Sequence, residues 1–432
     1  MLDIKLIRTK PELVKENIRR KFQDEKISLV DELLELDMKN REIKQEVEVL
    51  RANKNKLSKE IGNKMAQGLK EEAGEIRKNV SQNDGRIEQL TILEKQVEQD
   101  IRNILMSIPN IIDSSVPLGR DDRENVEIER FGEMDKPSFE IPYHIDIMES
   151  LAGIDLDSGR KVAGNGFYYL LGDVARLHSA VLTYARDFMI DKGFTYCIPP
   201  YMIRSNVVTG VMSFGEMDAM MYKIEGEDLY LIGTSEHSMI GKFKDSLIDE
   251  EELPQALTSY SPCFRKEKGA HGMEERGVYR VHQFEKQEMI VICKPEDSMD
   301  WYNQLWKNTV DMFRSLEIPV RTLECCSGDL ADLKVKSVDV EAWSPRQQKF
   351  YEVGSCSNLG EAQARRLGIR VKGEKEKYYA HTLNNTVVAP PRMLIAFLEN
   401  NLQEDSTIKI PEPLQPYMGG KKILAPRNKK MS

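Results

Sequence analysis

Residues 259–291 read SYSPCFRKEKGAHGMEERGVYRVHQFEKQEMIV, and this pattern predicts two strands joined by a charged, glycine-containing loop. Because side chains alternate between the two faces of a strand, Arg265 and Glu267 project side by side where the first strand enters the loop. In the absence of a bulge, one face of the second strand carries Arg280, His282, Phe284, Lys286 and Glu288. Such a charged face is costly to bury against an apolar core. It therefore faces either water, as a solvated hairpin with cross-strand ion pairs, or a polar ligand.

Three later segments place further polar side chains beside apolar runs, and they favour the ligand. Residues 233–237 (GTSEH) follow the apolar run LYLI and offer a hydroxyl and a carboxylate at a strand end. Residues 350–358 (FYEVGSCSN) alternate as a strand does and carry Glu352. Residues 381–392 (HTLNNTVVAPPR) lead directly into the helical run 393–400.

These motifs, in this order, resemble those of the class II seryl-tRNA synthetases, and the chain resembles the bacterial type of that family from its first residue to about Gly420. The resemblance implies an α+β fold with a catalytic domain on a mainly antiparallel sheet and an N-terminal antiparallel α-helical coiled-coil arm. Strands adjacent in sequence also favour such a sheet, with helices packed on it. The implied domains are 1–107 (tRNA binding, with the arm), 108–136 (linker), 137–420 (catalysis) and 421–432 (basic tail).

Composition narrows the class of protein. The 432 residues are 40% hydrophobic and 31% charged, and no run approaches the ~18 apolar residues of a membrane span. The six cysteines show no CxxC pairing, so we expect reduced thiols in a cytoplasmic protein without a structural zinc. A net charge of −9 argues against indiscriminate nucleic-acid binding, so we expect no DNA partner and only local basic patches for RNA.

Heptad spacing predicts the arm. Apolar residues recur every seven positions at Leu36, Ile43, Leu50 and Leu57, and a second seam holds Leu33, Val47 and Ile61 together with Asn40 and Lys54. Gly62, Gly68 and Gly74 interrupt the pattern before it resumes over 87–104. Two helical runs of about 30 residues form a hairpin that reaches roughly 45 Å.

Basic side chains gather toward the tip of this hairpin, at Lys54, Lys56, Lys59, Lys64, Lys70, Arg77 and Lys78. A coiled coil carries charged outer faces in any case, so these residues alone leave the function open. Lysine can offset phosphate charge without reading bases. The family resemblance implies that the arm lies along the long variable arm of tRNA(Ser), recognised by shape and backbone.

The remaining segments fill in the fold. Residues 2–7 (LDIKLI) are expected to form a strand, followed by a helix with Pro11 in its first turn. A helix opening near Asp173 and closing at Gly193 is followed by a strand that ends in two prolines. That helix and strand resemble motif 1 of class II synthetases, which implies a homodimer. The basic tail 421–432 is expected to be loosely ordered.

If ATP binds, it does so without a standard glycine loop, because neither G-x-x-x-x-G-K-[ST] nor a strand-linked G-x-G-x-x-G is present. The resemblance makes Arg265 and Arg392 the catalytic residues. Arg265 would hold the α-phosphate and the amino-acid carboxylate, and Arg392 would hold the γ-phosphate. Glu267 would accept from the adenine amino group, and Glu352 and Ser355 would ligate Mg²⁺ through oxygen. The other implied ATP-binding residues are Val278, Arg280, Val353 and Gly354.

The resemblance also implies the serine site and the reaction. L-serine is activated by ATP to seryl-adenylate and then transferred to the 3′ end of tRNA(Ser). The implied serine-binding residues are Thr234, Ser235, Glu236, Arg265, Glu288, Asn384 and Thr386. Such polar groups reject alanine or glycine because they are left unpaired without the substrate hydroxyl. The sequence assigns no general base for the transfer step.

Several segments depart from the family pattern. The loop of residues 268–280, which the resemblance makes the motif 2 loop, carries Lys268, His271 and Glu274. Two prolines precede Arg392 where a glycine is usual. Gly354 replaces a common serine, and residues 330–334 (LADLK) and 210–220 (GVMSFGEMDAM) also differ. None of these changes removes a charged group that the mechanism needs.

Two alternatives remain. One is a paralogue or inhibitor-tolerant duplicate that passes an aminoacyl-adenylate to another acceptor, against which the full arm speaks. The other is a non-catalytic RNA-binding protein on the same fold. That alternative predicts the loss of Arg265, Glu352 or Arg392, and all three are present.

Overall fold

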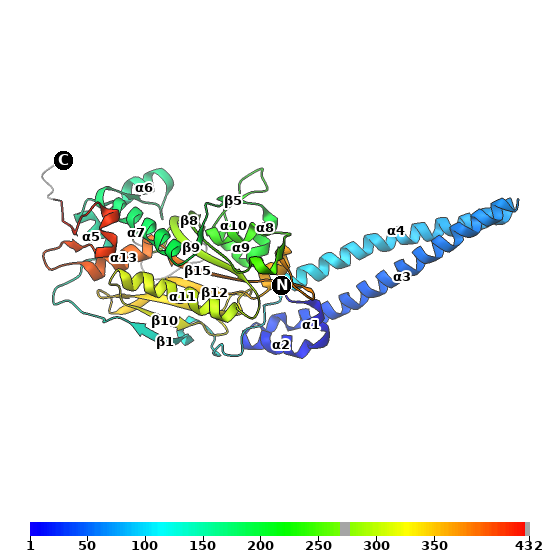
Figure 1. The fold of residues 1–432 in the computed structure, drawn as a ribbon, viewed down its shortest axis with the longest axis horizontal. Helices are drawn as coiled ribbons and strands as arrows, with labels where there is room; N and C mark the ends of the chain where they lie inside the picture. Colours follow the sequence, from blue (N-terminus) through cyan, green and yellow to red (C-terminus); the bar gives the residue numbers. More distant parts are fainter. Residues whose placement is uncertain (268–276, 428–432) are drawn as a thin grey trace. The chain divides into compact units, whose positions relative to one another are not determined.

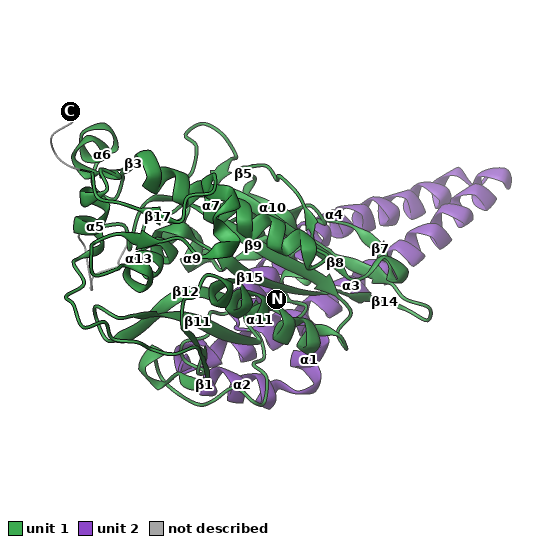
Figure 2. Ribbon diagram, turned by 60° about the vertical axis from the view of Figure 1, so that its left-hand side comes forward, with its two compact units in different colours: residues 1, 110–432 green, residues 2–109 purple. Residues whose placement is uncertain are grey.

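The computed structural model describes residues 1–267 and 277–427. The chain divides into two compact units, one of residues 2–109 and one of residue 1 with residues 110–432 (Figure 2). Within the described ranges, no helix combines the length and the apolar character that a membrane crossing requires.

The N-terminal unit is entirely helical. Its elements are α1 (Ile4–Thr9), α2 (Pro11–Arg20), the 3₁₀ turn η1 (Asp24–Lys26), α3 (Ile27–Ala66) and α4 (Lys70–Ser107). The predicted strand over residues 2–7 is wrong. The Asp3 side chain accepts a hydrogen bond from the backbone N–H of Lys5, which caps α1 and commits these residues to a helix. Helix α2 begins at Pro11, which lies in its first turn as predicted.

The arm is the antiparallel pair α3 and α4, confirmed as a long helical hairpin (Figure 1). The helices have 40 and 38 residues, so each extends about 60 Å and exceeds the predicted 45 Å. The prediction failed at the glycines. Gly62 and Gly74 lie inside the helices, because a cost of about 1 kcal/mol per glycine does not break a long helix. Gly68, with φ at +79°, makes the turn.

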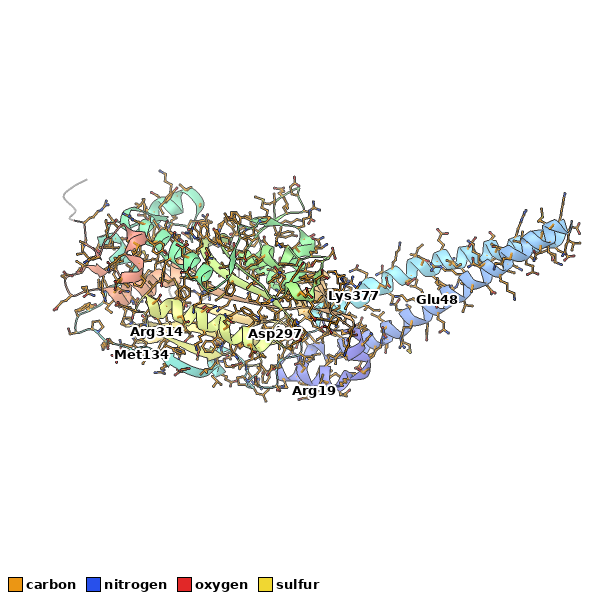
Figure 3. All side chains as sticks on the ribbon, viewed as in Figure 1. Arg19, Glu48, Met134, Asp297, Arg314 and Lys377 are labelled. Atoms are coloured by element: carbon orange, nitrogen blue, oxygen red, sulfur yellow. The ribbon has the colours of Figure 1, made fainter. Side chains whose placement is uncertain are left out.

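The seam of the arm follows the predicted heptads. Ile43 and Val47 of α3 pack on Leu90 and Val97 of α4. Asn40 is buried in the same seam, as the predicted polar register position. The outer faces carry charged side chains that project outward, Glu48 among them (Figure 3).

The second unit is built on an eight-stranded sheet, whose order confirms the predicted, mainly antiparallel fold. The strands, in spatial order, are β1 (Val126–Phe131), β10 (Val320–Glu324), β11 (Lys336–Ser344), β12 (Lys349–Asn358), β15 (His381–Val388), β9 (Gln283–Cys293), β8 (Gln255–Phe264) and β4 (Thr195–Tyr196). Only the pairing of β4 with β8 is parallel within this sheet. Strand β1 lies inside segment 108–136, which the sequence predicted as a linker.

Short strands and 3₁₀ turns complete the β structure. The strands are β2 (Ile154–Asp155), β3 (Tyr169–Leu170), β5 (Met202–Ile203), β6 (Tyr230–Leu231), β7 (Leu247–Asp249), β13 (Arg370–Lys372), β14 (Lys377–Tyr379), β16 (Ile408–Lys409) and β17 (Ile423–Leu424). The turns are η2 (Asp122–Glu124), η3 (Glu250–Glu252), η4 (Glu412–Leu414) and η5 (Pro416–Met418).

Helices cover both faces of the sheet. They are α5 (His144–Ser150), α6 (Leu156–Ala163), α7 (Gly172–Asp191), α8 (Ser205–Val211), α9 (Phe214–Met220), α10 (Ser235–Gly241), α11 (Ser298–Ser315), α12 (Ala362–Leu367) and α13 (Pro390–Asn401). Helix α7 buries one apolar stripe, which consists of Val174, Leu177, Val181, Leu182, Ala185 and Met189. The largest core cluster joins α7, α11 and α13 to one face of β9 through Met289 and Val291. On the other face, Ile290 and Ile292 pack against α10 and α12.

The tail is better ordered than predicted up to residue 427. Strand β17 pairs with β16, and Lys421 Nζ lies 2.6 Å from an oxygen of Asp173. The N–H of Arg427 donates to the carbonyl of Ser150 at 2.9 Å. The basic residues of 421–427 are therefore tied to the folded unit, while 428–432 lie outside the described residues.

Candidate active site

A cavity of about 430 Å³ opens on one face of the sheet, where the side chains of β9 change from apolar to mainly charged. Ile290 and Ile292 of that face are in the core, whereas Phe284, Lys286 and Glu288 line the cavity. The predicted site residues line the same cavity, with two exceptions. Ser235 is fully buried in the first turn of α10, and Val278 is buried in the main core.

One end of the cavity holds paired carboxylates. Thr234 caps α10 by accepting from the N–H of Glu236 at 3.3 Å, which fixes the start of the helix that carries Glu236. Asn384 donates to Glu236 Oε2 at 2.6 Å and to Glu288 Oε1 at 3.5 Å. Thr386 donates to Glu288 Oε2 at 3.4 Å. Five of the seven predicted serine-binding residues therefore form one hydrogen-bonded group, and Ser235 and Arg265 lie outside it.

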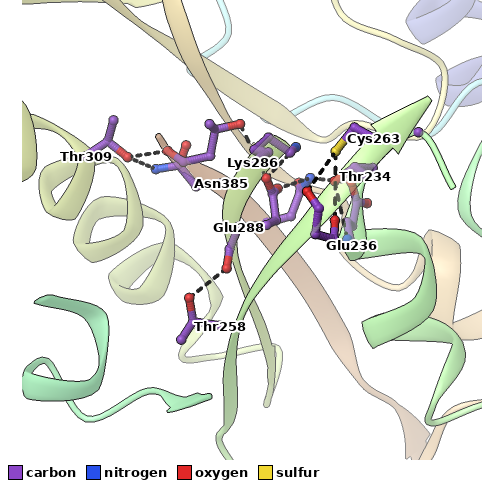
Figure 4. A network of polar contacts seen from close by, with 12 residues as sticks. Thr234, Glu236, Thr258, Cys263, Lys286, Glu288, Thr309 and Asn385 are labelled. Carbon is purple, nitrogen blue, oxygen red and sulfur yellow. Dashed lines mark hydrogen bonds and ion pairs between the residues drawn. The ribbon is translucent and has the colours of Figure 1, made fainter. Parts of the chain in front are cut away.

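Charged side chains at this end of the cavity are almost completely buried. Lys286 and Glu288 form an ion pair, and their side chains are 7% and 1% exposed (Figure 4). Burial, and then the nearby charge of Glu288, raise the pKa of Glu236 to about 7. The sequence prediction gave Lys286 no role. Its place two residues before Glu288, on the same strand face, was the available signal.

The hairpin departs from strict alternation at its open end. Strand β8 ends at Phe264 and β9 begins at Gln283, so Arg265, Glu267 and Arg280 lie beyond the strands. Glu267 has φ at +51°, which turns the backbone away from a strand path. The three side chains nevertheless line the cavity. Arg280 lies 3.2 Å from Glu267, so these two side chains form an ion pair beyond the ends of the strands.

Arg265 is held in place by two contacts. Its Nε donates to the carbonyl of Gly233 at 3.1 Å, and its guanidinium lies 5.1 Å from the ring centre of Phe284. These contacts orient the guanidinium and leave its NH1 and NH2 groups with no hydrogen bond to another described residue in the structure. A planar fork of that kind suits phosphate and carboxylate oxygens.

Arg392 lies in the first turn of α13, and the two prolines before it explain its position. Pro390 and Pro391 occupy the first positions of the helix, where a missing N–H costs nothing. Arg392 NH1 lies 2.9 Å from Glu352 Oε2, and its guanidinium lies 4.6 Å from the ring centre of Tyr279. Burial alone would raise the pKa of Glu352, but the charge and hydrogen bond of Arg392 hold it below its ordinary value.

A β-bulge brings the predicted magnesium ligands together. Residues three apart on a regular strand face opposite sides, which would separate Glu352 from Ser355. In β12, Glu352 pairs with Glu341 while Gly354 pairs with Val340, so Val353 is the extra residue. Glu352 and Ser355 both line the cavity as a result.

The oxygen donors at this bulge fit Mg²⁺. Asp339 lies opposite Ser355 in the β11–β12 ladder, and the Ser355 hydroxyl lies 3.4 Å from that of Ser337. Carboxylate and hydroxyl oxygens are the ligands that this hard cation takes. The sequence prediction did not include Asp339, which the pairing of β11 with β12 places opposite Ser355.

Family models match both units. The Seryl-tRNA synthetase N-terminal domain model matches residues 1–112, and the tRNA synthetase class II core domain (G, H, P, S and T) model matches residues 221–401. The chain is 41% identical to the serine–tRNA ligase of Thermococcus sibiricus, with 98% of each chain covered. The chain belongs to the seryl-tRNA synthetase family. It is also 39% identical to the serine–tRNA ligase of Methanospirillum hungatei, over 98% of this chain and all of that one.

Solved structures of the family agree with this fold. The seryl-tRNA synthetase of Pyrococcus horikoshii, complexed with ATP, matches with a TM-score of 0.93 and 39% identity over 99% of this chain and 100% of that chain. The cytoplasmic enzyme of Naegleria fowleri, in complex with AMP, matches with a TM-score of 0.87 and 33% identity over 99% of both chains. The predicted bacterial type has no support, because the relatives from Thermococcus, Methanospirillum and Pyrococcus are archaeal.

Two segments that depart from the predicted seryl-tRNA synthetase pattern also line the cavity. Within 210–220, Ser213 and Glu216 form a capping box that starts α9, and Glu216 and Met220 reach the cavity wall. Within 330–334, Lys334 lines the cavity and donates to Ser337 at 3.2 Å. The motif 2 loop with Lys268, His271 and Glu274 lies outside the described residues.

Proposed function

We propose that this chain is a serine–tRNA ligase, which activates L-serine with ATP and transfers serine to the 3′ end of tRNA(Ser). The observation that carries this proposal is the cavity itself. It combines a buried group of hydroxyl, amide and carboxylate side chains with two arginines, Arg265 and Arg392. The first group suits a small polar amino acid, and the arginines suit phosphates. Full-length similarity to serine–tRNA ligases supports the same conclusion.

Adenylate formation needs positioning and charge neutralisation more than covalent catalysis. Arg265 holds the serine carboxylate against the α-phosphate, and Arg392 takes the γ-phosphate. Glu267 accepts from the adenine amino group, with Arg280, Val353 and Gly354 also against the nucleotide. Val278 supports this wall from the core.

Magnesium completes the nucleotide site. Glu352, Ser355 and Asp339 would hold it, and when bound it neutralises charge on the phosphate oxygens. Before ATP binds, Arg392 and Glu352 satisfy each other across 2.9 Å. This pairing keeps both groups ordered and charged inside the site.

Charge balance explains how the buried end selects serine. Glu236 and Glu288 lie near each other, Lys286 pairs with Glu288, and Lys334 is a further cation near Glu236. A substrate ammonium group adds the positive charge that favours the ionised form of Glu236. Glu236 therefore takes the ammonium, together with Thr234, while Glu288 and Thr386 take the hydroxyl. Alanine would leave Glu288 and Thr386 without that partner, which is costly in a buried site.

We assign residues 1–107 to tRNA binding, 108–136 to a connecting segment, 137–420 to catalysis and 421–432 to a basic tail. The arm binds tRNA(Ser) through lysines at its tip. A homodimer is supported by the exposed apolar side chains of Leu171, Ile190 and Ile198, at the ends of α7 and after β4. The enzyme acts in the cytoplasm, where its tRNA partner resides.

Exchange of pyrophosphate into ATP tests the proposal without tRNA. Each of the twenty amino acids is supplied separately to the full chain with ATP and Mg²⁺. Exchange with serine alone is the expected result. Exchange with a different amino acid would overturn the substrate, and no exchange with any of them would refute the activity.

A further inference from the structure

Gln363 lies behind the cavity wall and touches the serine end of the site. It belongs to α12, its side chain is fully buried, and it was not among the predicted site residues. Its Nε2 donates to Glu236 Oε1 at 2.9 Å and to the carbonyl of Val211 at 3.1 Å. Its Oε1 accepts from the Thr382 hydroxyl at 2.6 Å. All the polar atoms of this amide are therefore used.

The surroundings allow only one orientation of this amide. The Val211 carbonyl can only accept a hydrogen bond, so the atom that faces it must be the NH₂ group. The same NH₂ group faces Glu236, and the Oε1 atom is left to face Thr382. Thr382 is itself fully buried in β15 and can rotate its hydroxyl to donate.

Both carboxylate oxygens of Glu236 therefore accept hydrogen bonds from side-chain amides. Gln363 holds one carboxylate oxygen and Asn384 holds the other, at 2.9 and 2.6 Å. The charged groups that face this carboxylate are Glu288 and Lys286 of β9 and Lys334 from the loop before β11. Glu288 opposes ionisation of Glu236, whereas the two lysines and the Gln363 hydrogen bond favour it.

We propose that Gln363 and Thr382 are positioning residues for serine, because they fix the orientation of Glu236 toward the substrate ammonium group. The inference rests on the proposed use of serine. Thr382 fixes the amide, the amide fixes the carboxylate, and the carboxylate binds the substrate. The same amide donates to Val211 of α8 and to Glu236 of α10, so one side chain holds both the cavity wall and the residue that binds serine.

Serine-dependent pyrophosphate exchange in Gln363→Leu tests this chain of contacts. A hydrogen bond to a charged group that is lost in a buried site corresponds to a rise in KM for serine on the order of 10- to 100-fold. The KM for ATP should stay within about twofold, because Gln363 touches no nucleotide-binding residue. The rise of kcat/KM for serine with pH should also move to higher pH, since the lost donor favoured the ionised carboxylate.

A matched pair of variants keeps the test decisive if Gln363→Leu does not fold. Thr382→Val removes the hydroxyl that fixes the amide and should raise KM for serine, whereas Thr382→Ser keeps it and should behave as the parent. Asn385→Leu is the structural control. Asn385 is also a fully buried amide on β15, but it donates to Leu305 and Thr309 of α11, away from Glu236. It should lower stability and leave the pH profile for serine unchanged.

An unchanged KM for serine in the folded Thr382→Val variant would overturn the positioning role. Equal rises in KM for serine and for ATP would overturn it too, since they indicate a general loss of structure. The parent chain separates this failure from that of the proposed function. If the parent shows no serine-dependent exchange, the function is refuted; if it does and the variants match it, only the positioning role is refuted.

Discussion

Removing the Lys286 ammonium should destabilise the catalytic unit more than the loss of any exposed ion pair. Lys286 is the cation paired with Glu288, and both side chains are almost completely buried. Lys286→Met keeps the length and apolar stem of the side chain and deletes only the charge. Glu288 would then remain in the interior beside Glu236 without its counter-charge.

The expected loss follows from the asymmetry of buried pairs. Breaking such a pair by removing one partner costs about 3–5 kcal/mol, because the other charge stays buried and uncompensated. Thr386 and Asn384 still donate to Glu288, at 3.4 and 3.5 Å, which places the expected loss at about 3 kcal/mol. Lys286→Met with Glu288→Gln removes both charges and should recover most of the lost stability.

Tryptophan fluorescence during urea unfolding measures this loss in the relevant unit. All three tryptophans, Trp301, Trp306 and Trp343, belong to the catalytic unit, so the arm does not contribute to the signal. Lys409→Met is the matched control. Lys409 pairs with Glu317 at 2.5 Å, but the two side chains are 49% and 52% exposed, so its loss should cost less than about 1 kcal/mol. Equal effects of Lys286→Met and Lys409→Met would refute the reasoning.

Three other perturbations test separate parts of the site. Arg265→Ala should abolish serine-dependent pyrophosphate exchange without lowering the urea midpoint, because Arg265 faces ligand; undiminished exchange would contradict its role. Thr386→Val should reduce kcat/KM for serine by about tenfold or more and leave that for alanine nearly unchanged, so equal losses would remove Thr386 from the hydroxyl site. Glu236→Gln should flatten the pH dependence of the free energy of unfolding. The pKa of this carboxyl is 4.5 in the unfolded chain and about 7 in the folded one. Its stabilising contribution is therefore present below pH 4.5 and is lost as the pH rises to 7. Urea midpoints at pH 5 and pH 8 that fall in parallel for parent and variant would contradict this assignment.

Periodic patterns allowed much of the fold to be predicted. The seven-residue spacing from Leu36 to Leu57 requires a partner helix, and the stripe of α7 requires a buried face. The hairpin of β8 and β9 follows from two strand-like runs around a polar loop. Each of these signals lies within one segment and depends on local geometry alone.

The features that were missed depend on contacts between segments. A strand was predicted over residues 2–7, but residues 4–9 form α1, because the Asp3 cap and the buried Ile7 decide the outcome. The bulge at Val353 is visible only in the register between β11 and β12. Gln363 gains its place because α12 packs against α8 and β15, and no spacing in the sequence relates it to Glu236 or Thr382.

Burial of a charged strand face is the feature on which the proposed chemistry depends. The sequence posed water and a polar ligand as alternatives for this face, and the structure encloses Lys286 and Glu288 almost completely. On a solvated hairpin, placing Glu236 next to Glu288 would not stabilise the fold, because exposed like charges repel each other and exposed ion pairs contribute little to stability. In a buried cavity, Glu236 lies beside the ion pair of Lys286 and Glu288, and a substrate ammonium can pair with the Glu236 carboxylate. The apolar positions Ile290 and Ile292 further along the strand anchor that face in the core. Strand β9 therefore supplies both the rigid support and Glu288, whose carboxylate lacks its substrate partner when the amino acid has no hydroxyl, so this polar end can discriminate between serine and such an amino acid.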